Sequence, residues 1–95
     1  MRIRWTLEAL KDLDEAVGYI AAEDGNTAKE VAVAIKVAAK SLARLPNRGR
    51  LGFVEGTREL LVPNLPYFFV FSIQNEQVEI LRLIHFSRKW PRFVQ

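Results

Sequence analysis

Residues 58–85 read RELLVPNLPYFFVFSIQNEQVEILRLIH and decide the fold class of this chain. Three runs rich in β-branched, aromatic and other apolar residues lie in this stretch, at Arg58–Val62, Tyr67–Ile73 and Gln77–His85. Only the short connections PNLP and QNE separate them, and links of this length join neighbouring strands as hairpins. The sequence therefore predicts three consecutive antiparallel strands.

The second and third runs are apolar on both of their alternating faces. Residues 67–71 read YFFVF without a polar interruption, and residues 80–84 read ILRLI. This pattern is typical of strands that are covered on both sides. We expect one face of the sheet to pack on other parts of the chain and some of the remaining apolar surface to meet a partner or a second copy.

Two amphipathic helices are predicted before this stretch, joined by a turn so short that they form an antiparallel hairpin. Thr6 can cap the first helix, and Asp24-Gly25 predicts its end. Its apolar stripe consists of Leu10, Leu13, Val17 and Ile20. The second helix starts at the capping-box pattern Thr27-Ala28-Lys29-Glu30 and stops at Pro46. Its stripe consists of Val31, Ile35, Ala38, Leu42 and Leu45.

The remaining segments complete the predicted order β-α-α-β-β-β. Arg2–Trp5 alternates polar and apolar residues, as a short strand does. Asn47–Thr57 contains three glycines and no sustained period, as a loop does. Because both helices carry an apolar stripe that must be buried, we expect one α+β domain over residues 1–95. In this domain an antiparallel helical hairpin packs on a small, mainly antiparallel sheet.

Length and composition exclude several classes of protein. Ninety-five residues with 49% hydrophobic and 26% charged side chains fit one globular domain. The absence of cysteine excludes disulfide scaffolds, zinc ribbons and thiol catalysis. No apolar run approaches the roughly 20 residues that span a bilayer, and the N-terminal residues lack the apolar core of a signal peptide. We expect a cytoplasmic protein with no membrane partner.

The net charge of +3 is concentrated in the second half of the chain. Residues 46–95 contain seven basic and four acidic side chains, and six of the seven cations are arginine. Arginine suits phosphate and carboxylate recognition better than lysine does. The asymmetry indicates an anionic partner, with a solubilising surface as the simpler interpretation.

The usual catalytic sets are missing from the sequence. A single histidine cannot form a multi-histidine metal site, and the sequence contains no metal-binding acid cluster, P-loop or nucleophile-elbow serine. We expect no metal, no cofactor and no small-molecule substrate. Arginines and one histidine could still cleave RNA, whose 2′-hydroxyl is an internal nucleophile. Arg58, at the start of one strand, and His85, at the end of another, could approach each other at one sheet edge, with Arg88 just beyond.

Several of these candidates also have a structural interpretation. His85 could hydrogen-bond the backbone at its strand end. Arg58 could form an ion pair with Glu59 or Glu79. Trp90 could stack on a base, or it could pack the tail onto the sheet.

Three further arginines are candidates for binding nucleic acid or another target. Arg48 and Arg50 lie in the glycine-rich loop, where the backbone can approach a phosphate closely, although a solvated loop explains them equally well. Arg82 is expected on the same face as Ile80 and Ile84, where it would be paired or would extend its charged end to solvent.

Four short motifs together resemble the RelE/ParE family, the toxins of bacterial type II toxin–antitoxin pairs. They are GRLG at residues 49–52, GTREL at 56–60, PY at 66–67 and ILRLIHFSR at 80–88. The resemblance covers nearly the whole chain, because the length and the β-α-α-β-β-β order of the family match those predicted above. It implies a cognate antitoxin, which we expect first on the helical hairpin.

The resemblance implies one of two mechanisms. RelE-like toxins cleave mRNA in the ribosomal A site. Arg58 and His85 lie at positions that resemble members of the catalytic site of RelE-like toxins. The chain departs from the RelE pattern, with no lysine between Lys40 and Lys89 and no tyrosine after Tyr67.

The GTREL and LIHFSR stretches are more similar to ParE-like toxins, which poison DNA gyrase. The resemblance therefore favours a non-enzymatic gyrase inhibitor. The alternatives are a metal-independent mRNA endonuclease that uses Arg58, His85 and Arg88, and a non-toxic RNA- or protein-binding module on the same scaffold.

Overall fold

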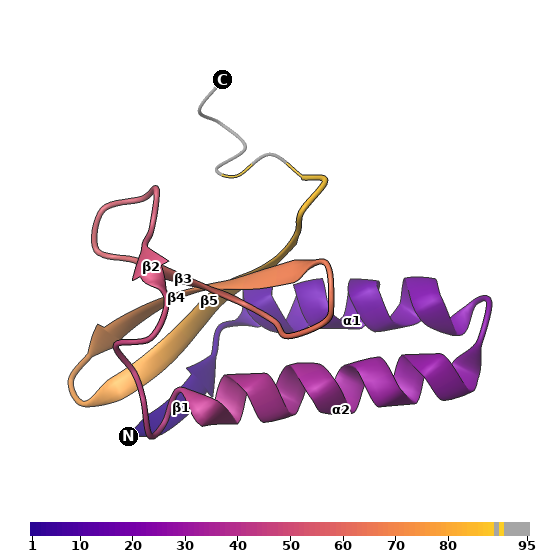
Figure 1. The fold of residues 1–95 in the computed structure, drawn as a ribbon, viewed down its shortest axis with the longest axis horizontal. Helices are drawn as coiled ribbons and strands as arrows, with labels where there is room; N and C mark the ends of the chain where they lie inside the picture. The colour runs from indigo at the N-terminus through magenta and orange to yellow at the C-terminus, as the bar shows by residue number, and fades with distance from the viewer. Residues whose placement is uncertain (89, 91–95) are drawn as a thin grey trace.

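A computed structural model describes residues 1–88 and 90 of the chain as a helical hairpin that covers one face of a five-stranded sheet (Figure 1). The elements are β1 (Arg2–Trp5), α1 (Leu7–Ala21), α2 (Gly25–Ser41), β2 (Arg50–Leu51), β3 (Arg58–Leu61), β4 (Tyr67–Gln74) and β5 (Gln77–His85). Neither helix is long and apolar enough to cross a membrane.

The strand order in the sheet is β1-β5-β4-β3-β2. The pairs β2–β3, β3–β4 and β4–β5 are antiparallel, whereas β1 lies parallel to β5. The α+β class and the three consecutive antiparallel strands are therefore confirmed. The expected loop at residues 47–57 differs in one respect, because two of its residues, Arg50 and Leu51, pair with β3.

The buried face of α1 matches the predicted stripe in part, because Leu13 is buried and Val17 and Ile20 pack against the core, but Leu10 does not. Thr6 is the N-cap, and its hydroxyl accepts a hydrogen bond from the Ala9 N–H at 3.1 Å. The helix buries Ala9, Asp12, Leu13 and Ala16. Leu10 is 45% exposed instead, because the small alanines let the helix approach the sheet closely and turn Leu10 outward.

The start of α2 is set by Asp24 and not by the predicted capping box. The Asp24 carboxylate accepts hydrogen bonds from the N–H groups of Asn26 at 3.0 Å and Thr27 at 3.2 Å. Thr27 lies inside the helix, and its hydroxyl donates to the same carboxylate at 2.9 Å. At the other end, α2 stops at Ser41, before Pro46, and Leu45 is 57% exposed.

This cap predicts a contribution to acid sensitivity. Hydrogen bonds from the Thr27 N–H and hydroxyl lower the pKa of Asp24 below its ordinary 3.8. A lowered pKa stabilises the fold above the unfolded-state value and is lost as pH falls through the folded-state value. Asp24→Ser keeps a capping oxygen that does not titrate, so it should lose less stability than the unmodified chain between about pH 4 and about pH 2. Thermal melts followed by circular dichroism test this, and parallel pH profiles would contradict it.

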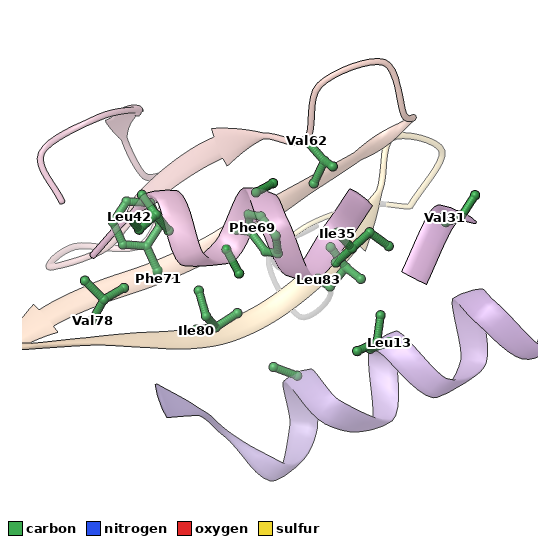
Figure 2. Packing of buried hydrophobic residues seen from close by; sticks show 13 residues of the cluster. Leu13, Val31, Ile35, Leu42, Val62, Phe69, Phe71, Val78, Ile80 and Leu83 are labelled. Carbon is green, nitrogen blue, oxygen red and sulfur yellow. The ribbon is translucent and has the colours of Figure 1, made fainter. Parts of the chain in front are cut away.

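The core lies between the helical hairpin and the inner face of β4 and β5 (Figure 2). Ile35 and Leu42 of α2 are fully buried against Phe69, Phe71 and Ile80 of the sheet. The central strand is covered on both sides as predicted, since Val70 is fully buried too. The predicted stripe of α2 is confirmed as far as Leu42.

A β-bulge in β5 changes which side chains face the helices. Phe71 pairs with Ile80 but Val70 pairs with Arg82, so Leu81 is an extra residue. Cross-strand partners share a face, so Ile80 packs toward the helices while Arg82 lies on the opposite face with Val70. Arg82 was predicted to share a face with Ile80 and Ile84; it shares one with Ile84, which pairs with Phe68, but not with Ile80, because the bulge lies between Ile80 and Arg82.

Candidate functional site

Arg58 and His85, the predicted catalytic pair, lie at opposite ends of the sheet. Arg58 is opposite Phe71 in the β3–β4 pairing, whereas His85 is opposite Tyr67 in the β4–β5 pairing. Four residue steps along β4 separate these positions, which is about 13 Å. In three consecutive antiparallel strands, the start of the first and the end of the third always lie at opposite ends, so the prediction that they approach each other is wrong.

Arg58 and Arg48 are hydrogen-bonded to uncharged oxygens near the end of α2. Arg58 donates to the backbone carbonyl of Asn47 at 3.3 Å. Arg48 donates to the Ser41 hydroxyl at 3.1 Å. The predicted ion pair between Arg58 and an acid of the sheet is not formed in the described part of the chain.

Those acids pair with other arginines. Glu79 pairs with Arg4 at 2.8 Å. Glu59 accepts two hydrogen bonds from Arg50, at 3.0 and 2.8 Å, and a third from the Phe53 N–H at 3.1 Å. The Glu59 side chain is only 6% exposed, so it holds the loop that follows β2 against β3.

Arg82 is a paired arginine, which was one of its two predicted states. It donates to both carboxylate oxygens of Asp12, at 2.7 and 2.9 Å, and the same carboxylate accepts the Leu83 N–H at 2.9 Å. The hydrogen bonds to Asp12 raise the pKa of Arg82 above its already high value. The Trp90 ring lies 5.6 Å from the Arg82 guanidinium carbon, so Trp90 packs on this ion pair. Residues 91–95 of the predicted tail lie outside the described part of the chain.

His85 and Arg88 do lie together, in a pocket of about 740 Å³ between α1 and the end of β5. Helix α1 contributes Asp12, Glu15, Ala16, Gly18 and Tyr19. The sheet and the turn after it contribute Tyr67, Leu83, His85, Ser87 and Arg88. The pocket therefore combines aromatic, cationic and hydrogen-bonding side chains with the carboxylates of Asp12 and Glu15.

The hydrogen bonds of His85 fix how its ring can act. The Ser87 N–H lies 3.0 Å from His85 Nδ1, and a backbone N–H can only donate. Nδ1 is therefore the acceptor, and the neutral ring carries its proton on Nε2. In this arrangement Nε2–H is the ring's free donor and Nδ1 is already occupied by the Ser87 N–H, so the ring is placed to donate a hydrogen bond to a ligand.

Tyr67 is a second donor in the pocket. Its ring meets that of His85 edge-on, with 5.1 Å between centroids and 89° between planes. Burial raises the pKa of Tyr67, the nearby Arg88 opposes this rise and Tyr19 adds to it. The phenol consequently stays protonated at neutral pH.

The pocket is suited to bind an acceptor-rich segment. Tyr67, the Nε2–H of His85 and Arg88 all offer donors, and Tyr19 adds an aromatic side chain that is 82% exposed. Sequence reasoning missed both tyrosines as site residues. Tyr19 is an exposed tyrosine on a helix, and its sequence context does not mark it as a site residue. Tyr67 is recognised as a site residue only from its pairing with His85.

Comparisons with known proteins converge on one family. The model of the family described as "ParE toxin of type II toxin-antitoxin system, parDE" matches residues 3–90. The chain is 42% identical over 91 residues to Y4kP of Sinorhizobium fredii, whose name marks it as a suspected toxin. This alignment covers 96% of this chain and 94% of that protein. The chain is also 34% identical over 87 residues to Toxin RelE2 of Caulobacter vibrioides, and this alignment covers 92% of this chain and 97% of that protein. A structure of the chromosomal ParDE toxin–antitoxin system of P. aeruginosa superposes with a TM-score of 0.83 at 27% identity, covering 90% of this chain and 95% of that one.

Proposed function

The chain belongs to the ParE toxin family of type II toxin–antitoxin systems, and we propose that it stops bacterial growth by binding and poisoning DNA gyrase. A cognate antitoxin is its partner within the system.

The separation of Arg58 from His85 carries this proposal. Cleaving RNA without a metal requires a proton acceptor beside cations that stabilise the phosphate. In the pocket, His85 Nδ1 already accepts the Ser87 N–H, and Arg58 lies at the other end of the sheet. Arg82 is committed to Asp12, which leaves Arg88 as the cation that lines the pocket with His85. These positions support a toxin that acts by binding.

The pocket is the surface we assign to gyrase. Its donors come from rigid elements, namely Tyr67 at the start of β4 and His85 at the end of β5, and they suit carbonyl or carboxylate groups of a protein segment. Gly18 of α1 lines the same pocket, and a Cβ built there meets nothing within 4 Å. A larger side chain at this position would therefore fill the pocket without disturbing the core.

The antitoxin is assigned to the helical hairpin. Val33 and Val37 of α2 are 60% and 62% exposed, and Leu7 and Leu10 of α1 are 64% and 45% exposed. Apolar side chains of this kind, repeated along helices, are the usual contacts for an amphipathic partner helix. This surface is distinct from the pocket.

Pulse induction in a bacterial host tests the target. Incorporation of labelled thymidine should fall within minutes, before that of labelled methionine, because gyrase poisoning stops replication first. With purified gyrase and plasmid DNA, the toxin should accumulate linear, cleaved DNA. Equal incorporation of both labels in induced and uninduced cells would leave a non-toxic binding module as the function.

Substitutions at Gly18 test the pocket. Gly18→Ala should keep full toxicity and stabilise α1 by about 0.5–1 kcal/mol, because alanine favours the helix. Gly18→Trp should fill the pocket and reduce gyrase cleavage at least about tenfold, equivalent to about 1.4 kcal/mol of binding. Matching melting temperatures for the two variants would show that both fold. Full activity of Gly18→Trp would exclude the pocket as the gyrase contact.

A RelE-like endonuclease is the second candidate, because His85, Tyr67 and Arg88 share the pocket and one relative is named RelE2. For such an enzyme, methionine incorporation should fall first and mRNA should be cut at defined positions in ribosomes. His85→Ala should then abolish toxicity.

A further inference from the structure

The net positive charge of the chain comes from one segment. Residues 40–58 contain one acid, Glu55, and five cations: Lys40, Arg44, Arg48, Arg50 and Arg58. This segment therefore carries a net charge of +4, and since the whole chain carries +3, the other residues together carry −1. The excess is far more local than the difference between the two halves of the sequence indicates.

The fold gathers these cations at one end of the molecule. The end of α2, the turn after it and β2 lie together there, away from the hairpin tip between α1 and α2 (Figure 1). Gly49 makes the turn possible, because its φ is +88° and a Cβ at this position would clash with the backbone carbonyl of Glu59. The turn is thereby held directly against β3.

Most of this charge is not neutralised within the described residues. Only Arg50 has a carboxylate partner, Glu59. Arg48 and Arg58 are held by the Ser41 hydroxyl and the Asn47 carbonyl, which are uncharged. These two guanidinium groups are therefore positioned while keeping their full charge, which is what binding an anion requires.

We propose that the basic surface formed by Lys40, Arg44, Arg48 and Arg58 binds the phosphates of duplex DNA. The choice of DNA rests on the proposed function, because a gyrase poison acts where gyrase holds a duplex. The planar guanidinium group of arginine can donate two hydrogen bonds to the oxygens of one phosphate. Leu51 and Phe53, which are 77% and 67% exposed beside this surface, offer apolar contacts to the sugars.

The basic surface and the pocket have separate tasks in this arrangement. His85 and the pocket lie at the end of the sheet where β4 begins, whereas Arg58 lies toward the end of β4. One end of the toxin can thus contact the gyrase protein while the other contacts the DNA that gyrase holds. Neither contact requires the other to form.

Fluorescence anisotropy with the purified full chain and a labelled 25-base-pair duplex tests the basic surface. Four phosphate contacts predict that log K falls with log salt concentration with a slope of about −3.6, independent of DNA sequence. Arg48→Gln with Arg58→Gln should flatten the slope by about 2 and weaken binding about tenfold at low salt. Glutamine can still donate to the Asn47 carbonyl, and melting curves would confirm that the variant folds.

Lys11→Gln with Lys29→Gln is the matched control, because it removes the same charge from exposed positions outside the basic surface. The control variant should give a slope of log K against log salt concentration within about 0.5 of the slope of the unmodified chain. An equal loss in the control, no binding at low salt, or tighter binding to poly-glutamate or to a matched RNA duplex would each overturn the proposal.

Gyrase cleavage with the same variants separates this inference from the proposed function. We expect Arg48→Gln with Arg58→Gln to poison gyrase about tenfold less well than the control. Full poisoning without DNA binding would overturn the DNA contact and leave gyrase as the target. If the unmodified toxin binds DNA through the basic surface but never poisons gyrase, the proposed function fails and the DNA site stands.

Discussion

Ile35→Ala and Leu42→Ala should each lower the free energy of unfolding by about 2–4 kcal/mol. Both side chains are fully buried between α2 and the sheet, where they pack with Phe69 and Phe71 (Figure 2). Truncation removes apolar surface from the core and leaves a cavity that neighbouring rings cannot fill without leaving their own contacts. In a chain of 95 residues this is a large part of the total stability, which is about 5–15 kcal/mol for a native domain. Urea unfolding followed by tryptophan fluorescence measures the loss.

Val33→Ala and Val37→Ala are the matched controls on the same helix. Their side chains are 60% and 62% exposed, so each substitution should change stability by less than about 0.5 kcal/mol. They should instead weaken binding of the cognate antitoxin, because they lie on the surface assigned to it. Indistinguishable melting curves for the buried and exposed substitutions would contradict the assignment of the two faces of α2.

Asp12→Ala should cost about 2–4 kcal/mol of stability, a large effect for a single polar residue. The Asp12 carboxylate is 7% exposed and accepts both donors of Arg82 and the Leu83 N–H. Alanine leaves a guanidinium in a partly buried site without its counter-charge and a backbone N–H without an acceptor. Because the Arg82 side chain is 24% exposed, water recovers part of this loss.

Two further variants separate the contributions of Asp12. Asp12→Asn keeps an oxygen for the Leu83 N–H but lacks the charge, so it should lose less stability than Asp12→Ala. Asp12→Leu combined with Arg82→Leu removes both charges together and should be more stable than Asp12→Leu alone. Additive effects of the two leucine substitutions would mean that the ion pair does not couple α1 to β5.

The apolar pattern of the sequence predicts the core of the fold and the order of its elements except β2 (Arg50–Leu51), a strand of two residues that is too short to show a period. Ile35 and Leu42 repeat at the helical period, and YFFVF, an aromatic-rich run between turn residues, favours a covered strand. The face of α1 could be obtained only in part, because Leu13, Val17 and Ile20 of the predicted stripe pack in the core but Leu10 does not. The helix buries the weakly apolar Ala9 and Ala16 together with a charged residue, Asp12, and a pattern of large apolar residues does not detect such a face.

The candidate site was harder to predict because it depends on one extra residue. Counting back from the Gln74–Gln77 pair in a regular hairpin places Tyr67 opposite Ile84. The bulge at Leu81 shifts this register by one residue and brings Tyr67 opposite His85. No residue in ILRLIH marks the bulge, so the sequence pattern does not reveal the pairing that builds the pocket. The separation of Arg58 and His85, by contrast, follows from the strand order alone.

The contacts of α1 with β5 also protect the sheet from polymerisation. Strand β1 covers β5 only from Gln77 to Ile80, so within the described residues 1–88 and 90 the next part of that edge has no neighbouring strand. The Thr6 hydroxyl donates to the Leu81 carbonyl at 3.0 Å, and Asp12 accepts the Leu83 N–H. These are the backbone groups through which a foreign strand would extend the sheet into aggregates. Thr6 and Asp12 thus occupy backbone groups of a strongly apolar strand edge, and we expect their removal to promote aggregation of the chain.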